Sequence, residues 1–226
     1  ILFGRLLGVA DDNFTKSFDI AIQLGAILAV VVLYWNKFSP FPLVSNSIEL
    51  DTKINTLKKV MVAFLPTAVI GFLFYGAIKI FLLSNALLVV WSLLLGGVAL
   101  IVFEVWYKVY SKKVSLADEI SYERSFLVGV AQSLSAIPGV SRSAATIVGG
   151  MLMGINRKTI VEFSFLLAVP TMVAATGYDL LNSAPEFSFD QFYVLAIGFA
   201  VSLIVAMLSI TWFLKFIENH TFIGFG

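Results

Sequence analysis

The segment "IPGVSRSAAT", Ile137–Thr146, decides how this chain folds because it places a helix break and an arginine inside an apolar stretch. It follows "SFLVGVAQSLSA" at 125–136 and precedes "IVGGMLMG" at 147–154. Pro138 and Gly139 divide the stretch into two arms of about 14 residues, each shorter than the roughly 20 residues that a membrane-spanning helix needs. The pattern therefore predicts a re-entrant helical hairpin with its tip at this Pro-Gly pair.

The composition indicates the class of protein in which this hairpin occurs. Of the 226 residues, 59% are hydrophobic and 13% are charged, and the mean hydropathy is +0.96. These values lie outside the range of soluble domains and predict a single integral membrane domain over residues 1–226. The net charge of +1 gives no basic field for nucleic acid, which we exclude as a partner. Because the sequence contains no cysteine, disulfides, thiolate catalysis and cysteine-ligated metals are excluded as well.

Five apolar runs are long enough to cross about 30 Å of hydrocarbon. They lie at Ser17–Trp35, Val60–Leu83, Ala86–Tyr107, Ile160–Leu181 and Phe192–Phe216. The predicted fold class is therefore an all-α polytopic membrane protein with about five full transmembrane helices plus the re-entrant hairpin.

The distribution of Lys and Arg favours the hairpin over a sixth crossing. The loops 36–59 and 108–124 are rich in basic residues, whereas the turn 84–85 has none. If residues 124–154 return to the side that they left, the basic pair at 157–158 joins the other basic loops, as the positive-inside rule requires. A full crossing would place this pair on the opposite side of the membrane.

The arginine at the hairpin tip is expected to be functional, because a charge at membrane depth costs at least about 2.5 kcal/mol unless an anion or water meets it. Ser141 is placed to cap the following helix, so the free N–H groups of that helix and the Arg142 guanidinium face one spot. This arrangement predicts a cradle for phosphate or carboxylate. The predicted catalytic residues are Arg142, Ser141, Ser143 and Thr146. The predicted substrate-binding residues are Gly139, Val140, Ala144, Glu162 and Gln23.

A non-functional interpretation is kept beside this one. The hydroxyls could bond back to their own helix while Arg142 pairs with a carboxylate elsewhere. For Glu162, and for Asp19 on the same helical face as Gln23, an interfacial position is about as expected as a site role. The residues expected to lie near water at a span end or at the terminus include Glu104 and His220.

The chain carries "PGVSRSAAT" at 138–146, "EFSFLLAVP" at 162–170 and "FDIAIQLGAILAVV" at 18–31. Together these segments resemble the bacitracin-resistance type of undecaprenyl-diphosphate phosphatase, over Phe14 to about Phe225. The PGxSRSxxT pattern is highly specific, although Ala144 replaces the glycine of many members. The resemblance implies a multi-pass enzyme of the bacterial plasma (inner) membrane that hydrolyses undecaprenyl diphosphate to the monophosphate and inorganic phosphate. That reaction recycles the lipid carrier of peptidoglycan synthesis. The resemblance also implies a divalent cation, Mg²⁺ or Ca²⁺.

The chain departs from the family pattern near its N terminus. The family's ExxxE motif and PVSSTGH-like segment, which supply carboxylates and a histidine, have no counterpart in Ile1–Asn13. We expect this motif to lie upstream of Ile1 and a further helix to follow the C terminus, so the metal ligands stay unknown. An upstream hairpin followed by the span at 18–31 would form an inverted repeat with the hairpin at 124–154. This symmetry supports an alternative hypothesis, a transporter or flippase for an anionic polyprenyl phosphate lipid, and a homodimer is left open.

Overall fold

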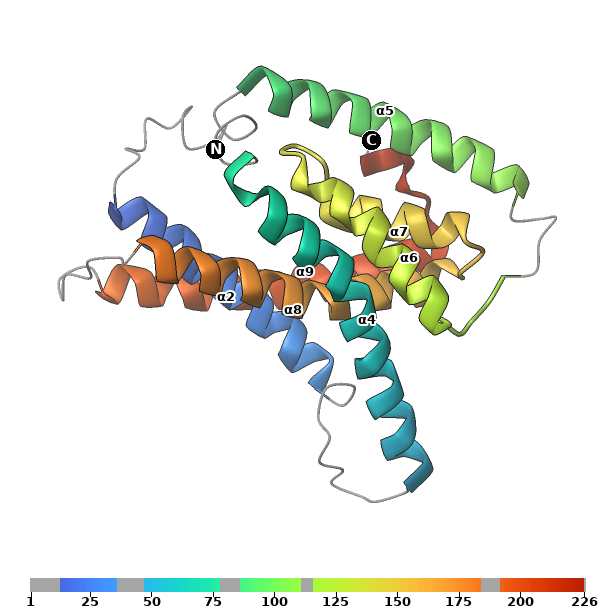
Figure 1. The fold of residues 1–226 in the computed structure, drawn as a ribbon, viewed down its shortest axis with the longest axis horizontal. Helices are drawn as coiled ribbons and strands as arrows, with labels where there is room; N and C mark the ends of the chain where they lie inside the picture. Colours follow the sequence, from blue (N-terminus) through green and yellow to red (C-terminus); the bar gives the residue numbers. More distant parts are fainter. Residues whose placement is uncertain (1–12, 36–46, 78–85, 111–115, 184–191, 226) are drawn as a thin grey trace. The chain divides into compact units, whose positions relative to one another are not determined.

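The computed structural model describes residues 13–35, 47–77, 86–110, 116–183 and 192–225. These ranges are helical and contain no β-strand, and only one isolated bridge, between Ala117 and Ile155, is present in them. The α-helices are α2 (Asn13–Leu33), α4 (Ser47–Ala77), α5 (Ala86–Tyr110), α6 (Tyr122–Gln132), α7 (Arg142–Leu152), α8 (Arg157–Ser183) and α9 (Phe192–Asn219). Two 3₁₀ helices are η2 (Ser133–Ala136) and η4 (Phe222–Phe225). The predicted all-α class is confirmed (Figure 1).

Within the described residues, four helices are long and apolar enough to cross a membrane, by length and composition. Their apolar portions are Leu50–Phe74, Leu87–Val109, Arg157–Tyr178 and Phe192–Ile217, and α2 contributes a shorter apolar stretch at Phe18–Leu33. Four of the five predicted spans thus correspond to these helices, and the fifth, Ser17–Trp35, corresponds to the shorter apolar stretch of α2. The end of the predicted span Val60–Leu83, residues 78–83, lies outside the described residues. Helix α4 begins at Ser47, whereas the sequence placed residues up to Lys59 in a loop. Hydropathy detects only the apolar part of this helix, and lysine is a good helix former that does not end it.

The long helices also expose apolar side chains, as a multi-pass membrane protein requires. The helix α5 is the clearest case, because it is apolar around most of its circumference. Its exposed side chains include Trp91, Leu94, Leu95, Val98, Val102, Val105 and Trp106. A surface of this size and composition is typical of contact with lipid or with another helix in a bilayer.

Residues 122–152 form the predicted helical hairpin (Figure 1). The first arm, α6, tightens into η2, and the second arm, α7, returns from Arg142. At the base of the hairpin, Ala117 N donates to Gly154 O at 2.8 Å, and Asn156 N donates to Ala117 O at 2.9 Å. The segments that enter and leave the hairpin are therefore hydrogen-bonded to each other, as expected for a chain that returns to the side it left.

Two glycines permit close helix packing, one between the hairpin and α4 and the other between the two arms of the hairpin. A Cβ on Gly129 of α6 would overlap the carbonyl of Ala63, which is fully buried on α4. A Cβ on Gly149 of α7 would lie 2.5 Å from the Cβ of Ala131 on α6. Small residues at such crossings permit the backbone proximity on which helix packing in membranes depends.

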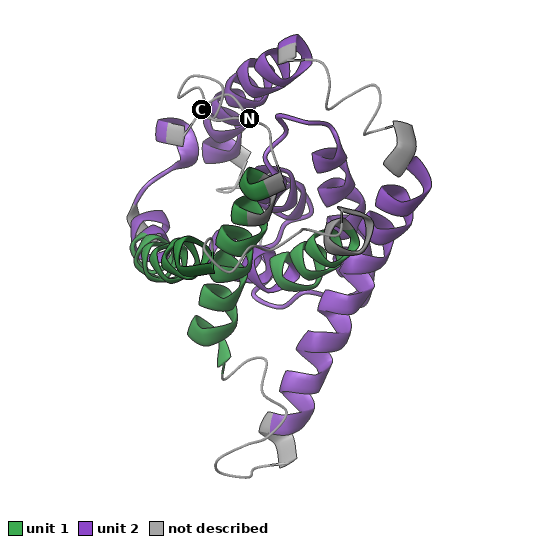
Figure 2. Ribbon diagram, turned by 90° about the vertical axis from the view of Figure 1, so that its left-hand side faces the viewer, with its two compact units in different colours: residues 1–35, 168–212 green, residues 36–167, 213–226 purple. Residues whose placement is uncertain are grey.

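The chain forms two compact units (Figure 2). One unit consists of residues 1–35 and 168–212, in which Ser202 Oγ donates to Ile22 O at 2.6 Å. The other consists of residues 36–167 and 213–226 and contains α4, α5 and the whole hairpin. The predicted arginine-serine site therefore lies within a single unit. The prediction that residues 1–226 form one domain stays a prediction.

Candidate active site

The hairpin tip is formed by two residues that restrict the backbone. Pro138 has no N–H to donate, so η2 does not continue through it. Gly139 adopts a φ of +94°, a conformation that favours glycine. Val140 N donates to Ile137 O at 3.0 Å and closes the turn. The chain then enters Ser141 in an extended conformation, with φ −67° and ψ 119°, from which α7 starts.

Ser141 is the N-cap of α7, which confirms the predicted capping role. Its Oγ accepts a hydrogen bond from Ala144 N at 3.3 Å and lies 3.2 Å from Ser143 Oγ. Both serines are exposed. The backbone ladder of α7 starts only with Ala145 N, which donates to Ser141 O at 2.9 Å, so the N–H groups of Arg142 and Ser143 have no acceptor within the helix. Hydroxyls and first-turn N–H donors thus gather at the positive end of one helix.

Arg142 is the first residue of α7, and its side chain is half-buried. Its Nη1 is buried and has no hydrogen-bond partner among the described residues. A buried donor without a partner costs about 1–3 kcal/mol, and more when it is charged. The non-functional interpretation pairs Arg142 with a carboxylate elsewhere in the chain. No carboxylate of the described residues bonds to Nη1, so this atom does not support that interpretation. An anionic ligand that brings acceptor oxygens to the tip would remove the penalty.

Thr146 differs from the other predicted catalytic residues because it is fully buried. Its Oγ1 donates to Arg142 O at 2.8 Å and lies 3.3 Å from Gln132 Oε1. The hydroxyl is thus bonded inside the hairpin, whereas those of Ser141 and Ser143 are exposed. Its predicted contact with a phosphate oxygen stays a prediction.

The three small or apolar residues predicted beside the arginine also lie at the tip. Gly139 contacts α5, where a Cβ on it would be 2.6 Å from Val89 O and 2.8 Å from Ser92 Cβ. Its missing side chain therefore makes room for α5. Val140 and Ala144 are half-buried on either side of Ser141 and Ser143. For these three residues, substrate contact stays a prediction.

Glu162 lies at the base of the hairpin and away from the groups at the tip. It lines a cleft of about 480 Å³ whose walls come from α4, from residues 118–120 and from the start of α8. The other charged side chains in this cleft are Lys59, Asp118, Glu119 and Lys158. Neither Arg142 nor the tip serines line it. The structure therefore places Glu162 in a separate, mixed-charge cleft.

Gln23 belongs to the other compact unit. It is exposed on α2, and its Oε1 accepts a hydrogen bond from Thr176 Oγ1 at 3.4 Å. Within that unit, this bond links α2 to α8. The predicted contact of Gln23 with the substrate stays a prediction.

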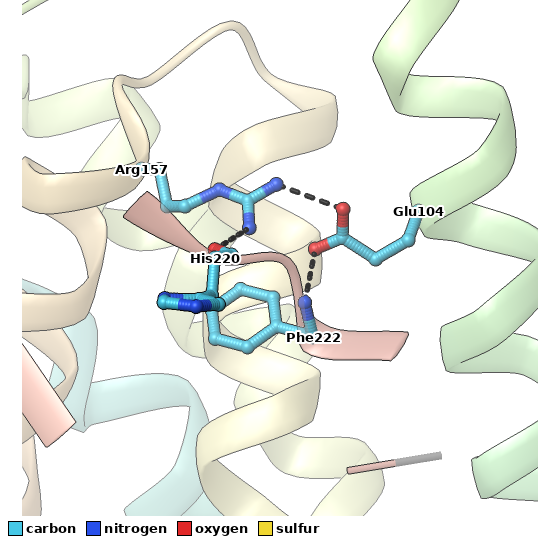
Figure 3. A network of polar contacts seen from close by, with 4 residues as sticks. All are labelled: Glu104, Arg157, His220 and Phe222. Carbon is cyan, nitrogen blue, oxygen red and sulfur yellow. Dashed lines mark hydrogen bonds and ion pairs between the residues drawn. The ribbon is translucent and has the colours of Figure 1, made fainter. Parts of the chain in front are cut away.

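An ion pair that the sequence did not predict lies beside the base of the hairpin (Figure 3). Glu104, expected near water, is only 2% exposed, and its Oε2 accepts from Arg157 Nη2 at 2.9 Å. Its Oε1 accepts from Phe222 N at 3.1 Å, and Arg157 Nη1 donates to His220 O at 3.3 Å. The Arg157 guanidinium also lies 4.8 Å from the centroid of the Phe222 ring. The sequence signal that could have predicted this ion pair is the position of Glu104 inside an apolar span, because an acid there needs a partner.

The predicted divalent cation requires hard oxygen ligands, chiefly carboxylates. Among the described residues, no group of three or more His, Cys, Asp or Glu lies close enough together to hold a metal ion. The tip provides hydroxyls and a guanidinium, which by themselves do not fit Mg²⁺ or Ca²⁺. The cation stays a prediction.

Comparisons with known proteins show which family this chain resembles. The family model described as bacitracin resistance protein BacA matches residues 1–226. An undecaprenyl-diphosphatase of Sulfurihydrogenibium sp. is 46% identical over 226 residues, which cover 100% of this chain and 84% of the relative. The undecaprenyl-diphosphatase of Aquifex aeolicus is 47% identical over 228 residues, with 100% and 83% covered. That of Wolinella succinogenes is 41% identical over 226 residues, with the same coverage. With its PGVSRSAAT hairpin tip and a match along its whole length, this chain belongs to the BacA family of bacitracin resistance proteins.

Proposed function

We propose that this protein hydrolyses undecaprenyl diphosphate to undecaprenyl phosphate and inorganic phosphate. The observation that carries the proposal is the hairpin tip, where Arg142 Nη1, which has no partner among the described residues, accompanies two exposed serine hydroxyls. Family membership and the activity named for relatives at 41–47% identity support the same reaction. The product is the lipid carrier of peptidoglycan synthesis, and its regeneration accounts for the bacitracin resistance that gives the family its name.

In this reaction water adds to the terminal phosphorus, the bond between that phosphorus and the bridging oxygen breaks, and the bridging oxygen stays with the lipid monophosphate. Catalysis then depends on holding the attack in line and on neutralising the non-bridging oxygens. We assign the neutralisation to Arg142, because a planar guanidinium can bind two oxygens at once. The first-turn N–H groups of α7 and the hydroxyls of Ser141 and Ser143 supply further donors.

The contacts of the two serines favour this electrostatic role over a nucleophilic one. A serine nucleophile needs an adjacent base to take its proton. Among the described residues, Ser141 Oγ and Ser143 Oγ bond to each other, and Ser141 Oγ also accepts from a backbone N–H. Neither hydroxyl is hydrogen-bonded to a carboxylate or an imidazole in that part of the chain. We therefore propose that they orient phosphate oxygens.

The substrate class also suggests where the protein acts. Its apolar helices and its family indicate a multi-pass membrane protein that meets a lipid substrate in the bilayer. We propose the bacterial plasma (inner) membrane as the location, because that membrane carries the polyprenyl phosphates of cell-wall synthesis. We also propose that a divalent cation, Mg²⁺ or Ca²⁺, assists the reaction through ligands other than the tip residues. A homodimer and the absence of a nucleic-acid partner stay predictions.

The test is phosphate release from a long-chain polyprenyl diphosphate in detergent, with and without Mg²⁺ or Ca²⁺. The intact protein is expected to release phosphate. Arg142→Ala is expected to release it about 100-fold more slowly, because the variant lacks a group that stabilises charge in the transition state. Arg124→Ala is the matched control, because it removes an arginine from the start of α6 at the opposite end of the same hairpin. An intact protein that binds the lipid and releases no phosphate would indicate a carrier or flippase instead.

A further inference from the structure

A buried glutamine joins three helices directly beneath the hairpin tip. Gln132 is the last residue of α6 and is fully buried. Its Nε2 donates to Thr67 Oγ1 of α4 at 3.0 Å, and its Oε1 lies 3.3 Å from Thr146 Oγ1 of α7. A single side-chain amide thus contacts hydroxyls on both helices that flank it.

The contacts continue from this amide to the backbone of the arginine. Thr146 Oγ1 donates at 2.8 Å to the carbonyl oxygen of Arg142, and its one proton is shared with the more distant Gln132 Oε1. On the other side, Thr67 Oγ1 donates to Gly129 O at 3.1 Å. The network therefore runs from α4 through α6 to the residue on which the proposed chemistry depends.

The packing around this network holds it in place. Gly129 lies one turn before Gln132 on α6 and abuts Ala63 on α4 so closely that no side chain fits between the two helices. Thr67 lies one turn after Ala63, which brings its hydroxyl within reach of the glutamine amide. The close contact between α4 and α6 therefore holds the Gln132 amide beside the Thr67 hydroxyl.

We propose that Gln132 is a positioning residue that acts through Thr146 to fix the first turn of α7, and with it Arg142 and the tip serines. The inference rests on the proposed function, since it concerns the placement of the groups that bind the diphosphate. It also assigns Thr146 to the support of the site, in agreement with its burial.

An apolar side chain would fill the same space without the cost of burying an amide whose hydrogen bonds are imperfect. The amide differs from leucine in fixing direction as well as distance, because its oxygen and nitrogen face different partners. A misplacement of about 1 Å at a reacting group can lower a rate by as much as 100-fold. The expected effect of losing the network is therefore on kcat more than on folding.

The experiment compares kcat and KM for polyprenyl diphosphate hydrolysis in the full-length protein with Gln132→Leu, Thr146→Val and the double variant. Each single variant is expected to lower kcat about 10-fold while KM changes about twofold or less, because ground-state binding needs less accurate placement. The kcat of the double variant is expected to be no lower than that of the less active single variant, since the two substitutions remove the same linkage. Thr146→Ser retains the hydroxyl and is expected to restore most of kcat.

Ser133→Ala is the matched control. Ser133 is the next residue of the same arm and is also buried. Its Oγ donates to Gly129 O at 3.0 Å, and among the described residues no hydrogen bond joins it to α7. Ser133→Ala is expected to keep the wild-type kcat, while its thermal unfolding midpoint changes about as much as those of Gln132→Leu and Thr146→Val.

If the wild type is active, any of three results would overturn the inference. Folded Thr146→Val could keep the wild-type kcat, or the losses of kcat in the two single variants could multiply in the double variant. The third is a loss of kcat in Ser133→Ala as large as that in Gln132→Leu or Thr146→Val. A folded wild type that releases no phosphate would overturn the proposed function together with the inference. The activity of the wild type therefore distinguishes the failure of the inference alone from the failure of both.

Discussion

The two ends of the hairpin region each contain an arginine, and the two arginines have opposite surroundings. At the base, Arg157 pairs with Glu104 at 2.9 Å, donates to a backbone carbonyl and lies over the Phe222 ring. At the tip, Arg142 is half-buried, and its Nη1 has no partner among the described residues. The fold thus satisfies the hydrogen-bond donors of the arginine at the base, whereas the arginine at the tip keeps a donor without a partner among the described residues.

On the proposed function, this difference separates a structural charge from a functional one. A satisfied guanidinium ties α5, α8 and the C-terminal segment together, and its loss leaves Glu104 buried without a counter-charge. An unsatisfied guanidinium contributes no bond at Nη1 to the folded state, so the penalty of burying it is offset only when a ligand binds. Variants at the two ends should therefore affect different measurements.

The largest effect is expected at the base. Arg157→Met should lower the free energy of unfolding by about 3 kcal/mol, at the lower end for a broken buried ion pair because the Arg157 side chain keeps 19% exposure. Thermal or denaturant unfolding in detergent measures this loss, and the folded fraction should keep its phosphate release. The double variant Glu104→Leu, Arg157→Met should regain part of the stability, because no charge is then left unpaired. A double variant as unstable as the single one would contradict the structural role of the pair.

Arg142→Met should give the reverse pattern at the tip. Phosphate release should fall about 100-fold, which corresponds to about 2.7 kcal/mol of transition-state stabilisation. The unfolding midpoint should stay the same or rise, because a partly buried charge with an open donor is removed. Both quantities are measured on one preparation. A loss of stability as large as that of Arg157→Met would remove the contrast between the two arginines.

The tip backbone should respond with a smaller effect. Gly139→Ala places a Cβ on a residue with φ +94° and 2.6 Å from Val89 O, so we expect a loss of about 2 kcal/mol in stability together with lower activity. Gly71→Ala on α4 is the control, because a Cβ there meets nothing within 4 Å. Unfolding midpoints of the two variants are compared, and equal values would show that the tip tolerates a displaced α5.

The smallest effect is expected from Ser141→Ala. Loss of the N-cap should cost about 1 kcal/mol of stability, since Ala144 N loses its side-chain acceptor. Ser141→Asp keeps a capping oxygen and should restore stability, but it should bind diphosphate poorly because its carboxylate repels an anion. If Ser141→Asp hydrolyses the diphosphate as well as wild type, the Ser141 hydroxyl does not lie near the phosphate.

Much of the fold follows from local pattern. Apolar runs located the four long apolar helices and the shorter apolar stretch of α2, because membrane spans require continuous hydrophobicity. The break at Pro138 and Gly139, with an arm of insufficient length on either side, was enough to predict the hairpin. The start of α4 at Ser47 was missed, because hydropathy reports the apolar part of a helix and not its amphipathic extension.

The candidate site was predictable to a similar extent. The types and spacing of Ser141, Arg142 and Ser143 indicated an anion cradle, which stays a prediction, while the structure confirms that Ser141 caps α7. Glu162 was grouped with them because it is polar within an apolar span, yet the structure places it in the cleft at the base. Sequence spacing alone does not give the distance between residues on different helices.

The sequence by itself determined the membrane class, the helical hairpin and the arginine between two serines at its tip, because each depends on neighbours within a few turns of helix. Only the tertiary structure decided which polar groups are satisfied. It paired Glu104 with Arg157 across 53 residues, and it joined Gln132 to Thr67 across 65. Such pairings depend on how helices pack, and in the described part of the chain that packing leaves Nη1 of Arg142 without a partner at the tip.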